Sequence, residues 1–277
     1  MPKLINAGQS PFGWHRYQSF MQCPQKYAYS YIINPKREPS LPLALGSLVH
    51  VGLAHHYKII QHRQLGTEHD LYSPLEAISE VVRFENQDVF REAEAKAYRI
   101  INFYQEKHCD EEEKWDILGV EDVITLWCGK APMTMRADLL FRSRKTGKIH
   151  FMDHKTTSRF TKSHPKFYAM SGQFVAYRIA GQNFYGDQWG SLVLNVIEHK
   201  ALKKPPYFRV FRPVLPDVTP IMGKFSASIE EVWNQMRKAH RSGKPPHTWT
   251  VRPTEFTCFH RYGACDHYDR CQLGLKK

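Results

Sequence analysis

The chain has 277 residues, 42% of them hydrophobic and 13% aromatic, which allows a sizeable core and excludes a wholly disordered protein. Its formal charge of +12 indicates a polyanionic partner, most commonly nucleic acid, with an acidic membrane surface or plain solubility as alternatives. No stretch is typical of a signal peptide or of the roughly 18 apolar residues of a membrane span. We therefore expect a cytoplasmic protein without a membrane partner, and a phage origin stays open.

Hydrophobic periodicity predicts helices first, then a run of strands, and then alternating elements. The expected helices cover residues 9–32, 46–64, 74–107, 166–180 and 220–241, and the expected strands cover 117–128, 132–141, 149–155, 191–198 and 207–213. This order favours an α/β fold with a mixed central sheet and flanking helices. We expect one domain over 1–277, with a helical part (1–115), a core (116–242) and a cysteine-rich tail (243–277).

Two acids and a lysine stand out within the predicted strands. Asp138 is placed at the end of the second strand, and Asp153 and Lys155 lie two residues apart in the third. Residues two apart on a strand share a face, so a neighbouring strand can bring Asp138 beside them. Paired carboxylates suit Mg²⁺ or Mn²⁺, which activates water, and a nearby lysine stabilises charge on a phosphate. The ordinary alternative is an exposed strand edge with a surface ion pair.

Further polar residues flank this group on predicted helices. Gly46 and His50 precede it, while Gln173 and Tyr177 follow it and share one helical face, four residues apart. The ordered series Gly-x-x-x-His, Asp, Asp-x-Lys and Gln-x-x-x-Tyr resembles the motifs of the PD-(D/E)XK superfamily, in its RecB/Cas4-like branch.

The resemblance implies a restriction-endonuclease-like core and a DNA nuclease, most simply an exonuclease. It also implies that His50, Asp138 and Asp153 bind Mg²⁺ or Mn²⁺, that Lys155 assists the attacking water, and that Gln173 and Tyr177 support the DNA and the site. Many relatives carry Glu where this chain has Asp153, and either carboxylate can bind the metal. The implied partners are DNA, as single strands or duplex ends, and protein subunits of a recombination, repair or CRISPR adaptation complex.

Cysteines mark both ends of the chain. Cys23 stands near the start, and Cys258, Cys265 and Cys271 lie in the tail. Four thiolates suit either an iron–sulfur cluster or zinc. One distant cysteine plus three C-terminal ones resembles the [4Fe-4S] frame of Cas4 and AddB-type nucleases, although the first tail gap is longer than usual there. Zn²⁺, with His260 or His267 replacing a thiolate, and four unrelated thiols are the alternatives. Cys109 and Cys128 fall outside the pattern.

Two basic stretches with interleaved aromatic residues, 199–212 and 237–252, suit a phosphate backbone and stacked bases. A solvated strand edge and helix face explain them equally well. Two rival functions remain: a non-catalytic nucleic-acid-binding partner subunit with the same fold and a structural iron–sulfur or zinc site, and a zinc-stabilised DNA-binding protein.

Overall fold

The computed structural model describes residues 2–5, 12–33, 38–200, 207–251, 258–260, 263–265, 267 and 271. The chain forms two compact units that interleave along the sequence. The first comprises residues 1–10, 38–126 and 135–222, and the second comprises residues 11–37, 127–134 and 223–277. Whether the whole chain acts as one domain with the three parts expected from the sequence stays a prediction.

A five-stranded sheet in the order β1-β2-β3-β4-β5 organises the first unit. Its strands are β1 (Trp115–Cys128), β2 (Ala131–Ser143), β3 (Ile149–Thr157), β4 (Trp189–Lys200) and β5 (Tyr207–Phe211). Strand β3 pairs antiparallel with β2 but parallel with β4, and β4 pairs antiparallel with β5. The parallel pair needs a crossover connection, which α7 (His164–Ala169) and α8 (Gly172–Tyr185) supply. This mixed sheet confirms the expected α/β class.

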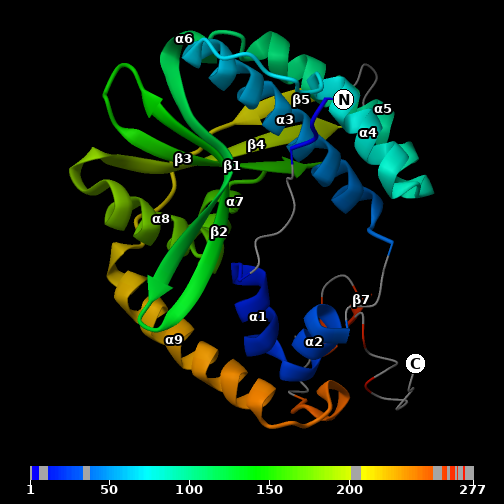
Figure 1. Cartoon of the computed structure of the whole chain (residues 1–277), viewed down its shortest axis with the longest axis vertical. Coiled ribbons are helices and arrows are strands. Elements are labelled where there is room, and N and C mark those ends of the chain that lie inside the picture. Colours follow the sequence, from blue (N-terminus) through cyan, green and yellow to red (C-terminus); the bar gives the residue numbers. More distant parts are fainter. Residues whose placement is uncertain are drawn as a thin grey trace. The chain divides into compact units, whose positions relative to one another are not determined.

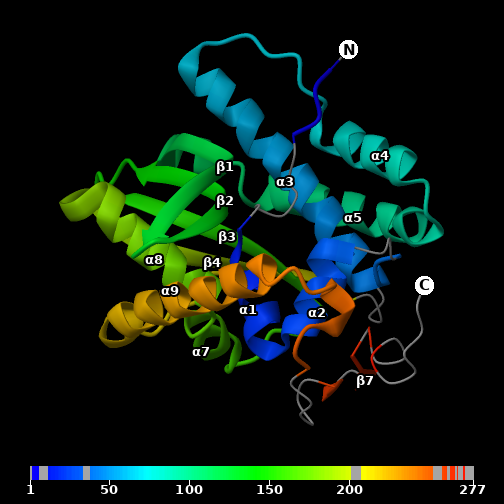
Figure 2. The same cartoon turned by 60° about the horizontal axis from the view of Figure 1, so that its bottom comes forward.

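Helices cover both faces of this sheet (Figures 1 and 2). On one face lie α3 (Leu41–Leu65), α4 (Pro74–Glu85) and α5 (Asp88–Lys107), and the short α6 (Glu111–Lys114) leads into β1. Apolar side chains of α3, α4 and α5 form one core with Leu139, Met152 and Ile197 of the sheet. On the other face, Phe151 of β3 packs edge-on against Tyr177 of α8. Helices therefore bury both faces of the strands that carry Asp138 and Asp153.

Three of the predicted helices each divide into more than one element. The first breaks at Cys23, whose extended backbone (φ −162°, ψ 115°) follows from Pro24, because proline disfavours a helical residue before it. The third breaks at Asn86, which adopts a left-handed conformation (φ 51°). The fourth breaks at Ser171, whose side chain caps α8 by accepting a hydrogen bond from the Phe174 amide.

The second unit is mainly helical. It contains α1 (Trp14–Gln22), α2 (Pro24–Ala28), the π-helical turn η1 (Tyr29–Ile33), α9 (Thr219–Arg241) from Gly223 onward, the 3₁₀ turn η3 (Pro246–Thr248), and the two-stranded sheet of β6 (Phe259–His260) and β7 (Gly263–Ala264). None of the helices within the described residues is long and apolar enough to cross a bilayer.

Aromatic contacts hold this unit together. Phe12 meets Trp233 of α9 edge-on, with ring centroids 5.9 Å apart, and Trp14 lies 5.7 Å from Phe225. The ring of Tyr27 stacks on Trp249 at 6.3 Å. Segments from both ends of the chain therefore share one apolar interior.

Close packing of α3 against α5 gives a stability prediction. A Cβ at Gly52 would lie 2.7 Å from Cγ1 of buried Ile101 and 3.1 Å from Cδ1 of Ile78. We expect Gly52→Val to lower the free energy of unfolding by about 1–3 kcal/mol because it overpacks this contact. Urea denaturation of the variant measures the loss. Ser47→Val, at an exposed position of the same helix, should change stability by only about 0.5 kcal/mol, and an equal loss in both variants would contradict the packing account.

Candidate active site

Helix α3 brings His50 to the sheet. Pro42 stands in its first turn, and Gly66 ends it in a left-handed conformation (φ 63°), as proline and glycine typically do. Leu48 and Val49 are fully buried, so the half-buried His50 lies at the edge of the apolar contact. Its Nδ1 is 3.4 Å from Oδ2 of Asp138. Burial alone would lower the pKa of His50, but the negative charge of Asp138 raises it to about 9.

Asp138 lies within β2 and not at its end, because the strand continues to Ser143, beyond the predicted boundary. Its side chain is 8% exposed, and Oδ2 accepts a hydrogen bond of 2.6 Å from the backbone amide of His154. Burial favours the protonated acid, yet the charge and hydrogen bond of His50 hold the pKa of Asp138 below its usual value. Asp138 is thus a carboxylate fixed by two neighbouring elements.

Asp153 and Lys155 project from the same face of β3 and form an ion pair. Nε2 of Gln173 donates to Oδ1 of Asp153 at 3.1 Å and also contacts the Tyr177 hydroxyl at 3.2 Å. That hydroxyl donates to the backbone carbonyl of Arg136 on β2. Burial, and then the charge of Asp138, raise the pKa of Asp153 to about 6 despite Lys155. The structure therefore brings the predicted α8 residues onto the predicted β3 acid.

The sequence interpretation missed Glu121 of β1. Ligand atoms of His50, Glu121 and Asp138 all lie within 4.8 Å of one another. Glu121 is buried and has a positive φ of 55°, which a residue with a side chain rarely adopts. Burial and the charge of Asp138 raise its pKa to about 8. The sequence signal is weak, because exposed Asp122 stands beside it and nothing in the pattern shows which acid turns inward.

Asp153 is not part of this group of three, and its oxygens contact Lys155 and Gln173. The structure thus gathers His50 and Asp138, two of the predicted metal ligands, with an acid that was not predicted. The roles of Asp153, Lys155, Gln173 and Tyr177 stay predictions. A histidine nitrogen with two carboxylates is a donor set that suits Mn²⁺ or Mg²⁺. The elevated pKa of Glu121 fits this interpretation, since a cation there would favour its ionised form.

On the opposite face of β3, His154 enters a buried polar network. The Asn195 carbonyl oxygen accepts a hydrogen bond from Nε of Arg212 at 2.7 Å. This orients the amide so that its Nδ2 donates to Nδ1 of His154 at 2.8 Å. Burial lowers the pKa of His154 to about 3, so the ring is neutral. Arg212 in turn pairs with Glu111, which also accepts from the Tyr57 hydroxyl at 2.6 Å. This network fixes the segment whose amide holds Asp138.

The four expected cluster ligands all belong to the second unit. Burial, and then the thiols of Cys23, Cys265 and Cys258, raise the pKa of Cys271 to about 11, so the four side chains are electrostatic neighbours. Among the described residues they do not form a group whose ligand atoms lie within 4.8 Å of one another. The iron–sulfur cluster stays a prediction.

The zinc alternative and the two remaining cysteines have separate outcomes. His267 is buried, with Nε2 3.0 Å from the Ser30 hydroxyl, whereas the side chain of His260 lies outside the described residues. Cys128 is buried, as expected for a core residue, and Cys109 is exposed.

The sequence model of the PD-(D/E)XK nuclease superfamily matches residues 12–272. The fold is similar to a crystal structure from Eubacterium rectale named as a candidate exonuclease, with a TM-score of 0.47, 15% identity, and coverage of 96% of this chain and 89% of that one. It is also similar to the protein named SSO0001, with a TM-score of 0.30, 13% identity, and coverage of 91% and 96%. No curated protein sequence matches.

The buried pair of Arg212 and Glu111 gives a pH prediction. Burial raises the pKa of Glu111, but His108 and Arg212 hold it below its ordinary value. Such a carboxyl contributes stability above its unfolded pKa, and this contribution is lost as pH falls through the folded pKa. In Arg212→Met, the pKa of Glu111 rises because the charge and hydrogen bond of Arg212 no longer offset burial. We expect a loss of about 3–5 kcal/mol near neutral pH that shrinks as the pH is lowered and Glu111 becomes protonated.

Urea denaturation over a series of pH values measures this difference. Arg144→Met, which removes an exposed ion pair with Asp116, should cost at most about 1 kcal/mol. Parallel stability curves for wild type and Arg212→Met at all pH values would show that Glu111 does not depend on Arg212.

Proposed function

We propose, because the chain belongs to the PD-(D/E)XK nuclease superfamily, that it is a metal-dependent deoxyribonuclease of the RecB/Cas4-like branch that degrades DNA as an exonuclease. The observation that carries the proposal is the meeting of His50, Glu121 and Asp138 beside the Asp153–Lys155 pair. The family match includes all five residues. The cellular process would be recombination, repair or the processing of CRISPR or phage DNA.

The donor set supports His50, Asp138 and Glu121 as ligands of Mg²⁺ or Mn²⁺. Asp153, which the family resemblance implies as a ligand, is proposed as a further one. When bound, the cation would lower the pKa of a water molecule and neutralise charge on the scissile phosphate. This would be hydrolysis of a phosphodiester bond, with water adding to phosphorus and the sugar oxygen leaving.

Lys155 has the clearest separate role in this proposal. The carboxylates of Asp153 and Asp138 raise its pKa against the effect of burial, so it carries a positive charge. From its place beside Asp153 it would orient the attacking water and stabilise the negative charge that develops on phosphate oxygens. Gln173 holds the other oxygen of Asp153, and Tyr177 ties α8 to β2, so both are positioning residues here.

The complete set of acids and lysine disfavours the rival function of a non-catalytic nucleic-acid-binding subunit. A protein that only binds DNA has no use for several buried acids beside a half-buried lysine, because burying unneeded charge is costly. His50 pairs with Asp138 and Lys155 pairs with Asp153, whereas burial and Asp138 raise the pKa of Glu121, an arrangement that supports a site for a cation.

The nuclease proposal predicts that the protein degrades end-labelled DNA with Mn²⁺ or Mg²⁺ and not with chelator. Asp138→Ala and Lys155→Ala should each reduce the rate by at least about a hundredfold, because each removes charge stabilisation in the transition state. Single-stranded and duplex substrates labelled at either end also report polarity and strand preference. Wild-type protein that binds DNA but cuts nothing with either metal would contradict the proposal and favour the binding subunit.

Glu121 gives a separate prediction. If it is a ligand, Glu121→Gln should raise the Mn²⁺ concentration needed for half-maximal activity, with activity recovered at higher Mn²⁺. The matched control is Asp122→Asn on the neighbouring exposed position, which should leave the Mn²⁺ dependence unchanged. A Glu121→Gln variant with the Mn²⁺ dependence of wild type would remove Glu121 from the ligand set.

We also propose a [4Fe-4S] cluster held by Cys23, Cys258, Cys265 and Cys271, supported by the contribution of the other three thiols to the raised pKa of Cys271. Anaerobically purified protein should contain iron and absorb visible light, and Cys271→Ser should lose both. Cys109→Ser, which changes the exposed cysteine outside the set, should retain them. A colourless, iron-free protein that contains zinc would establish the zinc alternative.

A further inference from the structure

The C-terminal part of α9 has an unusual charge distribution. From Val232 to Val251 the sequence contains no aspartate or glutamate, but it contains Arg237, Lys238 and Arg241. The buried side of the helix is formed by Val232 and Met236, which places these three cations away from the apolar interior. Positive charge therefore collects on the outer face of one helix.

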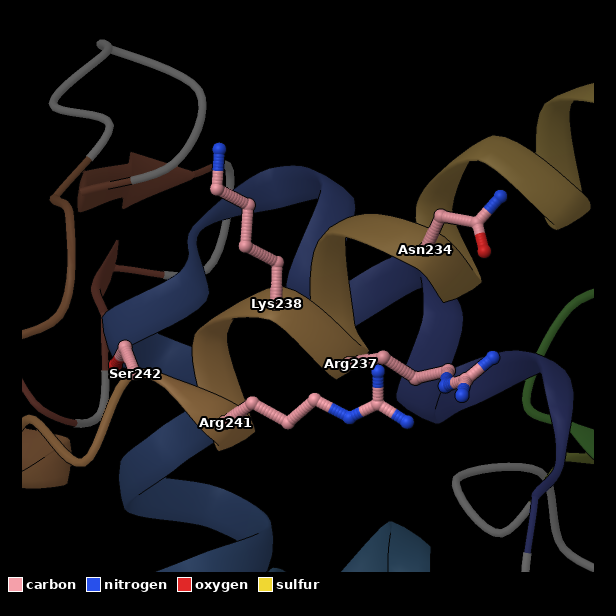
Figure 3. A pocket seen from close by; sticks show the side chains of 5 residues that line it. All are labelled: Asn234, Arg237, Lys238, Arg241 and Ser242. Carbon is pink, nitrogen blue, oxygen red and sulfur yellow. The ribbon is translucent and has the colours of Figure 1, made fainter.

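The outer face of α9 is hollowed. Arg237, Lys238 and Arg241, together with Asn234 and Ser242, line a cavity of about 440 Å³. Figure 3 shows the side chains of Arg237 and Arg241 extending in the same direction from successive turns, while Lys238 leaves the helix on another side. Two guanidinium groups thus face one shared space, with the amide of Asn234 near one end.

Like charges three or four residues apart destabilise a helix. Within the described part of the chain, the acids of α9 are engaged elsewhere: Glu230 accepts from the Lys130 amide at 2.9 Å, and Glu231 from Nε2 of Gln235 at 3.2 Å. The helix dipole favours cations in the last turn, which accounts for Arg241. That effect decays within one turn, so it does not account for Arg237. An external anion between the guanidinium groups would relieve their repulsion.

A second hollow continues this surface. Lys238 and Ser242 also line a neighbouring cavity of about 320 Å³, together with Lys244 and Trp249. Trp249 is only 7% exposed, and its indole donates to the Lys244 carbonyl at 3.1 Å. The aromatic stacking that the sequence suggested for this stretch is therefore not offered by Trp249 in the described structure. Cations, an amide and a hydroxyl remain, which are the groups that contact phosphate oxygens.

We propose that the outer face of α9, formed by Asn234, Arg237, Lys238, Arg241 and Ser242, binds the sugar–phosphate backbone of DNA without reading its base sequence. The proposal deepens the nuclease function proposed above and rests on it for the identity of the polyanion. Successive phosphates of one strand match a row of cations along a helix better than a single small anion does, because the cations occupy two adjoining hollows. The face adds affinity for the DNA and takes no part in bond cleavage.

The test is equilibrium binding of a fluorescein-labelled duplex and of the matching single strand, in EDTA, over a series of KCl concentrations. Each lost phosphate contact lowers the slope of log affinity against log salt by about 0.9 on duplex DNA and about 0.7 on single strands. The triple variant Arg237→Gln, Lys238→Gln, Arg241→Gln should therefore lose about 2 to 3 from the slope. The loss should be equal on oligonucleotides of unrelated sequence.

The matched control removes the same charge from exposed positions of the first unit: Arg99→Gln, Lys107→Gln, Lys145→Gln. Its slope should stay within one phosphate contact of wild type. Equal slopes for the α9 variant and wild type, or equal losses in both triple variants, would overturn the proposal, as would wild-type protein that binds no DNA at low salt. Thermal unfolding verifies that both variants are folded.

Cleavage with Mn²⁺ is measured separately on the wild-type protein. Binding that depends on α9 without cleavage would refute the nuclease function and leave the backbone-binding face in place. Cleavage with an unchanged salt slope in the α9 variant would refute only the face.

Discussion

The buried carboxylate of Asp138 is the constraint on which the rest of the site depends. A charge in a dry interior is costly unless neighbouring groups compensate for it, and here His50 of α3 and the amide of His154 on β3 do so. Glu121 lies in the same group, and its pKa of about 8 shows how strongly this environment opposes a further negative charge. A bound divalent cation would compensate the negative charge of Asp138 and favour the ionised form of Glu121. The geometry therefore supports the proposed metal chemistry.

The alternation of β3 links the chemistry of the site to the stability of the unit. Asp153 and Lys155 point to α8, whereas His154 between them points to the layer of α3 and α5, where it stacks on Tyr57. Beyond His154, Asn195 and Arg212 continue the polar contacts as far as Glu111. A change in that network therefore moves the backbone amide that holds Asp138, so distant polar substitutions can alter the site without touching it.

Much of this arrangement could be predicted from the sequence, because short-range periodicity places Asp153 with Lys155 on a strand and Gln173 with Tyr177 on a helix. That these two pairs serve one site was implied by the resemblance to the ordered motifs of the PD-(D/E)XK superfamily. Glu121 could not be predicted, because it ends a run of three consecutive buried residues, and its left-handed backbone interrupts the alternation of β1. The helix breaks depended on single residues, such as Pro24 acting on Cys23 and the left-handed Asn86, within otherwise continuous helical patterns. The burial of Trp249 depends on Tyr27, which is distant in the sequence.

The most direct test of the account is a crystal structure of the protein soaked in Mn²⁺, with anomalous scattering recorded to locate the metal. The account predicts one strong anomalous peak at coordination distance from His50, Glu121 and Asp138, with Asp153 beside it. A Mn²⁺ peak at another place in the first unit, or full occupancy of this position without contact to Asp138, would contradict the metal centre and with it the proposed nuclease mechanism.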